Sequence, residues 1–160
     1  MRSRPCACAA CASRPRHSGL PTKKEADRPR ETVPERLADA TGSAVFGAFD
    51  EDGLLLGVGG LHRQTQRKAR HRAGIWGMYV VTEARGRGVG RAVLRALVDH
   101  ARTLEGVHRL ELGVEATNTA ARALYLTAGF TSYGVQPDAY RADGQSYDSE
   151  LMTLALEDAA

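Results

Sequence analysis

A glycine-rich run with three arginines, RGRGVGR at residues 85–91, separates an apolar segment from a segment of helical period. Where such a turn opens a helix, missing side chains let the backbone approach an anion, and the first helical N–H groups point at it. Arg85, Arg87 and Arg91 can add charge-assisted contacts to that anion, or they are solvated surface charges. The run predicts a phosphate-binding loop, with a plain tight turn as the structural alternative.

Two common nucleotide motifs do not fit this run. A mononucleotide P-loop needs a Gly-Lys pair, and the chain has none. The dinucleotide motif G-x-G-x-x-G/A begins with Gly86 and Gly88 but puts Arg91 where close helix–strand packing requires a small residue. The pattern that remains is R-x-x-G-x-G, formed by Arg85, Gly88 and Gly90.

Residues 118–130 carry a second pattern, N-x-x-A-x-x-L-Y-x-x-x-G-F. Asn118 is a good helix N-cap, and Gly129 suits the position just after a helix. The phenol of Tyr125, with an ordinary pKa near 10, can give a proton to a thiolate whose conjugate acid has a pKa of about 8.5. Helix capping alone for Asn118 and aromatic packing for Tyr125 are the structural alternatives.

Four side chains are candidates for a general base. Glu111 and Glu115 share one face of the alternating segment 109–115, His62 ends an apolar segment, and Glu83 lies beside the glycine-rich run. No motif singles out one of them, and surface charge is the alternative for each.

These residues are positioned by a predicted order β-β-β-α-β-α-β-β. Strands are expected at 45–49, 54–61, 74–81, 109–115, before 142 and at 147–156, and helices at 89–101 and between 118 and 129. Residues 63–72 are polar and basic, which predicts an exposed loop between the second and third strands.

The two patterns, together with a closing hairpin around residues 143–152, resemble the GNAT N-acetyltransferase superfamily over about residues 43–156. The resemblance implies an α/β (α+β) fold with a mixed, mostly antiparallel central sheet flanked by helices, and acetyl-CoA as cosubstrate. It implies that Tyr125 protonates the departing thiolate and that the amide near Val80 polarises the thioester carbonyl, and we add Glu115 as the candidate base. The cofactor-binding residues that it implies are Met78, Tyr79, Val80, Arg85, Gly86, Arg87, Gly88, Val89, Gly90, Arg91, Asn118 and Tyr125.

The N-terminal segment departs from the family. Residues 1–34 are expected to be a basic, disordered leader and linker, and 35–160 the acetyltransferase domain. Only residues 31–40 could be helical there, so the usual first strand and helix are expected to be missing and the acceptor pocket is in doubt. The cysteines Cys6, Cys8 and Cys11 lie in this leader, with His17 nearby. They are interpreted as low-complexity sequence rather than a zinc site, and no metal is expected.

Charge and hydropathy exclude several classes of protein. The net charge of +3 comes from six basic residues in 1–24, a segment without acids, and the remainder has 16 basic and 19 acidic residues. Because this remainder, the body of the chain, carries more acidic than basic residues, it is not expected to be a nucleic-acid-binding domain. The chain has no apolar run of about 18 residues and no apolar core of a secretory signal, so no membrane partner and a cytoplasmic location are expected. A homodimer is one option for the oligomeric state.

The leading hypothesis is an enzyme that moves the acetyl group of acetyl-CoA to a primary amine by direct attack. The body has no cysteine that could carry an acyl group, which fits this route. The acceptor could be a small-molecule amine, a protein N-terminus or a lysine. A non-catalytic acyl-CoA-binding protein and a partner-binding module that uses the basic stretches are the alternatives.

Overall fold

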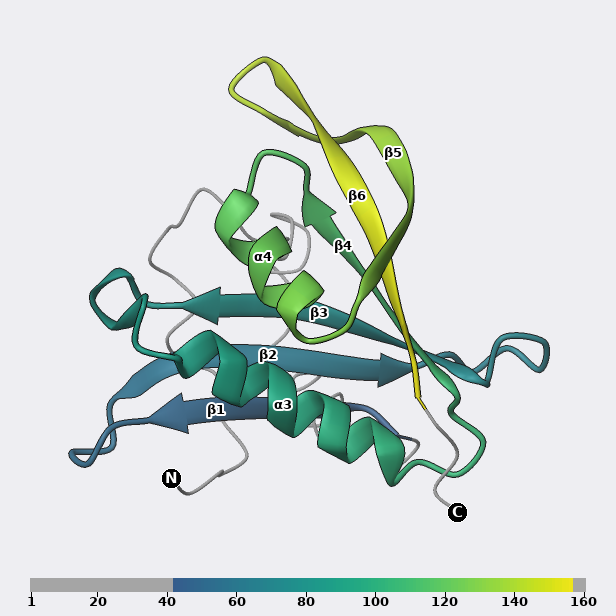
Figure 1. Ribbon diagram of the computed structural model, residues 1–160, viewed down its shortest axis with the longest axis horizontal. Coiled ribbons are helices and arrows are strands. Elements are labelled where there is room, and N and C mark those ends of the chain that lie inside the picture. Colours follow the sequence, from purple (N-terminus) through teal and green to yellow (C-terminus); the bar gives the residue numbers. More distant parts are fainter. Residues whose placement is uncertain (1–41, 157–160) are drawn as a thin grey trace, which may run out of the picture.

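The computed structural model describes residues 42–156, which form one mixed sheet with two α-helices. Figure 1 shows both helices, α3 and α4, in front of the sheet. The elements in chain order are β1 (Ala44–Phe49), β2 (Leu55–Arg63), β3 (Arg72–Val80), a 3-10 helix (Thr82–Ala84), α3 (Val89–Arg102), β4 (Arg109–Glu115), α4 (Thr119–Thr127), β5 (Thr131–Ala142) and β6 (Gln145–Ala155).

The sheet has the strand order β1-β2-β3-β4-β6-β5, and β3–β4 is its one parallel pair. This parallel pair is short: it begins at Arg72 and Arg109 and ends at Gly74 and Glu111. Beyond that point β4 keeps pairing with β6, and β3 with β2. The two central strands therefore diverge, and Figure 1 shows the opening between them with α4 in front of it.

A β-bulge lies in β3 next to this opening. Gly60 pairs with Trp76 and Val58 with Tyr79, so two residues of β3, Gly77 and Met78, face the single residue between them on β2. Gly77 has a φ of 62°, which glycine adopts without steric cost. An extra residue re-aims the strand that follows it, so the bulge sets the direction of β3 along the opening.

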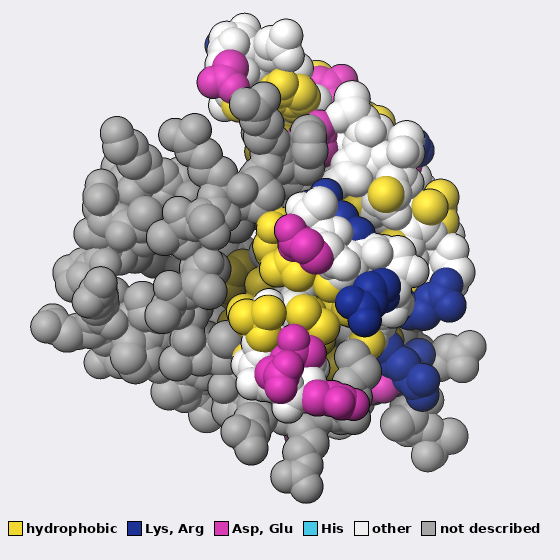
Figure 2. Space-filling model, turned by 90° about the vertical axis from the view of Figure 1, so that its left-hand side faces the viewer, with side chains coloured by type: hydrophobic (Ala, Val, Ile, Leu, Met, Phe, Trp, Pro, Cys, Tyr) yellow, Lys and Arg dark blue, Asp and Glu magenta, His cyan; other side chains and the backbone are white. Residues whose placement is uncertain are grey.

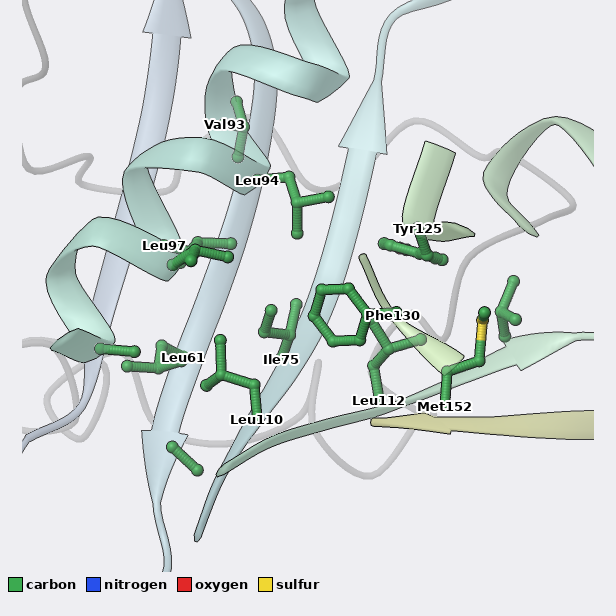
Figure 3. Packing of buried hydrophobic residues seen from close by; sticks show 14 of the residues in the cluster. Leu61, Ile75, Val93, Leu94, Leu97, Leu110, Leu112, Tyr125, Phe130 and Met152 are labelled. Atoms are coloured by element: carbon green, nitrogen blue, oxygen red, sulfur yellow. The ribbon is translucent and has the colours of Figure 1, made fainter. Parts of the chain in front are cut away.

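The main core lies between α3 and the sheet. The six apolar residues that the sequence places on one helical face, from Val89 to Ala101, are all buried in α3. Figure 3 shows Leu94 and Leu97 directed toward Leu61 and Ile75 on the sheet. A Cβ on Gly57 of β2 would lie 2.8 Å from the side chain of Val89. The missing side chain thus lets the first turn of α3 pack directly on the sheet.

The structure confirms the predicted order of elements and the mixed, mostly antiparallel sheet. It differs at element ends: β3 stops at Val80, because residues 82–84 form a 3-10 turn that buries Ala84. The last strand starts at Gln145, two residues earlier than predicted. The expectations about the leader, its cysteines, the helix at 31–40 and the missing first strand and helix concern residues outside the described range.

Candidate functional site

The glycine-rich run presents a row of free backbone donors at the start of α3. Gly88 is the N-cap with φ 82°, and Gly86 also has a positive φ of 73°. Within the described residues, no backbone carbonyl accepts a hydrogen bond from any amide between Gly86 and Arg91. A Cβ at Gly86 or Gly88 would meet no atom within 4 Å, so space is open in front of these amides. Unpaired amides at a helix N-terminus form a ready anion site.

The arginines of the run play different parts. Arg85 Nε donates to the carbonyl oxygen of Val80 at 3.2 Å and so holds the loop against the end of β3. Arg87 and Arg91 are exposed, and no acidic side chain in residues 42–156 pairs with either of them. Figure 2 views the molecule from the loop end and shows Lys and Arg side chains gathered in the right-hand part of this face. These positive charges are available to an anion at the loop.

The edge of β3 that faces the opening pairs with no described strand, although the Val80 carbonyl oxygen accepts a hydrogen bond from Arg85 Nε. The amide of Val81 donates to Leu56 O at 2.9 Å, which directs Val81 toward β2. Main-chain groups alternate in direction along a strand, so those of Val80 and Met78 point into the opening, while Tyr79 pairs toward Val58 on β2. An extended ligand arm could pair with this edge as an added strand.

Tyr125 lies at the same opening, on the side of the helices. Its ring packs edge to face on Phe130, with centroids 5.9 Å apart, and the residue is 6% exposed. Figure 3 shows it beside Phe130, Leu112 and Met152. Its hydroxyl has no hydrogen-bond partner in the described part of the chain. Burial raises the pKa of Tyr125 to about 12, so the phenol keeps its proton at neutral pH.

The raised pKa predicts a specific loss of stability in alkali. The pKa of Tyr125 is higher in the folded chain than its ordinary value of about 10. The stability that the protonated phenol contributes is therefore fully present below pH 10 and is lost as the pH rises toward 12. Between pH 9 and 11 the wild type is expected to lose about 1.4 kcal/mol more than Tyr125→Phe. Urea unfolding at both pH values measures this, with Tyr133→Phe, an exposed tyrosine on β5, as the control. An equal loss in wild type and Tyr125→Phe would contradict the assignment.

Helix α4, which carries Tyr125, is fixed at two points. The side chain of Asn118 accepts a hydrogen bond from the Ala121 amide at 3.1 Å, which confirms the predicted N-cap. Arg122 forms a hydrogen-bonded ion pair with Glu150 of β6, a carboxylate that is 8% exposed. The Arg122 guanidinium lowers the pKa of Glu150 against the opposing effect of burial, so Glu150 stays ionised. The pair ties α4 to the sheet and thereby orients the tyrosine.

Of the base candidates on β4, Glu115 lies beyond the point where this strand stops pairing with β3. Glu111 is bound to Arg72, with contacts of 3.1 and 3.2 Å, at the closed end where β3 and β4 still pair. Glu115 ends β4 and accepts a hydrogen bond from the Thr117 hydroxyl. Glu83 is exposed in the 3-10 helix, and His62 lies against Gly74 at the closed end. As predicted, Glu111 and Glu115 share a face, because the alternate residues Leu110, Leu112 and Val114 are buried in the core.

Two features at this site were not predicted from the sequence. One is the bulge at Gly77, and the other is a buried serine, Ser149, on β6 beside β4. Strand periodicity indicates which face Ser149 occupies, but the sequence does not show that it is buried. A surface hollow lined by His71, Arg72, His108, Arg109 and Glu111 lies at the opposite end of β3 and β4. Within residues 42–156, no group of three or more His, Cys, Asp or Glu side chains could hold a metal ion.

Comparison with known proteins gives one consistent result. A family model described as "Acetyltransferase (GNAT) family" matches residues 14–130. The chain is 32% identical over 80 residues to an L-methionine sulfoximine/L-methionine sulfone acetyltransferase of Pseudomonas aeruginosa. This match covers 50% of this chain and 46% of that protein. It is 48% identical over 59 residues to the N-alpha-acetyltransferase RimI of Mycobacterium tuberculosis, covering 37% and 35%. The chain thus spans about half the length, or less, of these curated relatives.

Solved structures extend the similarity to most of the chain. A ribosomal-protein-alanine N-acetyltransferase from Brucella melitensis superposes with a TM-score of 0.69 at 31% identity, covering 79% of this chain and 75% of that one. The yncA acetyltransferase from Salmonella typhimurium, solved with acetyl-CoA, gives a TM-score of 0.70 at 26% identity, covering 82% and 73%. Among the described helices, none is long and apolar enough to cross a membrane.

Proposed function

Because the chain belongs to the GNAT acetyltransferase family, we propose that it moves the acetyl group of acetyl-CoA to a primary amine by direct attack. The observation that carries this proposal is the meeting of three features at one opening in the sheet. These are the amides of residues 86–91, the edge of β3 that pairs with no described strand, and the buried hydroxyl of Tyr125.

The residues present suit acetyl-CoA as the cosubstrate. The amides from Gly86 to Arg91 bind the pyrophosphate, and Arg87 and Arg91 add positive charge beside it. The main-chain groups of Met78 and the amide of Val80 pair with the pantetheine arm along the opening. Acetyl-CoA supplies an acetyl group activated as a thioester, and the chain supplies position and proton transfer.

Three groups divide the chemistry between them. The Val80 amide donates to the carbonyl oxygen and stabilises the negative charge that develops there. Tyr125, on the helical side of the sheet, gives its proton to the sulfur as the C–S bond breaks and the C–N bond forms. Glu115, on the other face of β4, takes the proton that the amine loses. The acid and the base thus act from opposite sides of the opening.

The acceptor proposed is a free amino acid or a protein N-terminus. Relatives named for these substrates support both, among them the L-amino acid N-acyltransferase MnaT of Escherichia coli and RimI of Mycobacterium tuberculosis. A protein lysine, the cytoplasmic location and the homodimer stay predictions. For the dimer, the outer edge of β5 pairs with no described strand and exposes Tyr133 and Val135.

The proposed activity is tested by measuring thiol release from acetyl-CoA with a panel of free L-amino acids and of peptides with free N-termini. Release is expected to depend on the amine. Glu115→Gln is expected to lower kcat/KM about 100-fold at pH 7, with a smaller loss at high pH, where more of the amine is already deprotonated. Glu105→Gln, an exposed carboxylate after α3, is the control and should keep full activity. Binding of acetyl-CoA without release for any amine would favour a non-catalytic acyl-CoA-binding protein.

A further inference from the structure

Two hydroxyl groups converge on the part of β4 where Gly113 has no side chain. A Cβ built on Gly113 would come within 2.7 Å of Ser149 Oγ and 3.7 Å of the Tyr140 hydroxyl. The Ser149 oxygen therefore occupies part of the space that a side chain at this position would need, and the Tyr140 hydroxyl borders that space. Ser149 belongs to β6 and Tyr140 to β5, so three neighbouring strands meet at this hydroxyl pair.

Ser149 is the unusual member of this group. The residue is 2% exposed, and its buried hydroxyl has no hydrogen-bond partner within residues 42–156. A buried hydroxyl that makes no hydrogen bond destabilises a fold, and such groups call for an explanation. Alanine would fill the same place without that cost, so the hydroxyl is better explained by a ligand than by folding.

The hydroxyl pair lies on the proposed acceptor side of the opening. Gly113 is two residues beyond Glu111, the last residue of β4 that pairs with β3. It shares its face of β4 with Glu115, away from the core that holds Tyr125. Ser149 pairs directly with Glu115 in the β4–β6 register, so its hydroxyl and this carboxylate lie on adjacent strands.

The three side chains match the donors of a primary ammonium group. When it is ionised, the carboxylate of Glu115 accepts hydrogen bonds and donates none. The hydroxyls of Ser149 and Tyr140 can each accept a hydrogen bond from one N–H group. A primary ammonium has three N–H donors, and the carboxylate balances its charge. We propose that Ser149 binds the acceptor amine, together with Glu115 and Tyr140, and selects primary over N-methylated amines. This inference rests on the proposed function and names the residue that recognises the acceptor.

The test compares Ser149→Ala with the wild type, using the best amine of the panel and its N-methyl derivative. Loss of one hydrogen bond to a charged group is expected to raise the KM for the primary amine about tenfold. The preference for the primary amine should shrink, while the KM for acetyl-CoA stays unchanged. The melting temperature should not fall, because the hydroxyl has no partner to lose among the residues that the structure describes. Ser146→Ala, an exposed serine on the same strand, is the control.

Two results would overturn the inference while leaving the proposed function intact. One is an unchanged amine KM and selectivity in Ser149→Ala, and the other is a melting temperature several degrees lower, which would give the hydroxyl a structural role. Absence of amine-dependent thiol release in the wild type would instead overturn the proposed function, and the inference with it.

Discussion

Replacing Gly88 with glutamate is expected to abolish the binding of acetyl-CoA in a chain that still folds. Gly88 has φ 82° at the N-cap of α3, so any other residue there is strained by about 1–2 kcal/mol. Glutamate also brings a negative charge and bulk into the space before the free amides, where the pyrophosphate is expected. The affinity should fall at least 100-fold, which is about 2.7 kcal/mol.

Thermal unfolding with and without acetyl-CoA measures this effect. A ligand at about 100 times its Kd adds roughly 2.7 kcal/mol to the apparent stability of the wild type, and Gly88→Glu should show no such gain. Gly53→Glu is a matched control, because Gly53 has a similar φ of 84° and open space around it, but lies in the turn between β1 and β2. Equal gains for Gly88→Glu and Gly53→Glu would contradict the assignment of the loop.

Replacing Tyr125 with phenylalanine is expected to lower kcat about 100-fold or more and to leave acetyl-CoA binding nearly unchanged. A positioned general acid contributes 10²–10⁴-fold to a rate, and the phenol of Tyr125 is buried, protonated and without a hydrogen-bond partner in the described residues. Phenylalanine keeps the packing on Phe130 and removes only the hydroxyl.

A steady-state comparison with a thermal-shift control separates the two effects. Tyr125→Phe should give the wild-type stability gain with acetyl-CoA, and thiol release at about one hundredth of the rate or less. Tyr133→Phe, which changes an exposed tyrosine of β5, should match the wild type in both measurements. A kcat within threefold of the wild type would show that another group, or water, protonates the leaving thiolate.

The elements of the fold could be predicted because their signals are local. The helical period from Val89 to Ala101 coincides with the buried face of α3, and the alternation from Leu110 to Val114 coincides with the buried face of β4. Asn118 and Gly129 bound α4 as their capping preferences predict, with Gly129 at φ 93°. The position of the glycine-rich run between a strand and a helix is also predicted correctly, because its signal is local too.

The features that the sequence did not reveal depend on contacts between distant segments. The exact point at which β3 and β4 stop pairing, after Gly74 and Glu111, is marked by nothing local in the sequence. The isolation of Ser149 depends on three strands meeting around Gly113. The ion pair that removes Glu111 from the base candidates joins residues on two strands. Each of these requires knowledge of the strand order.

The central claim is that acetyl-CoA binds along the glycine-rich run and the free edge of β3. An NMR titration of the 15N-labelled chain with acetyl-CoA tests it most directly, because each amide reports on its own surroundings. The largest changes in chemical shift are predicted for the amides of residues 86–91 and of Val80, with small changes at the far end of β3 and β4. Changes centred on His71 and His108, or no changes in a folded chain, would contradict this account.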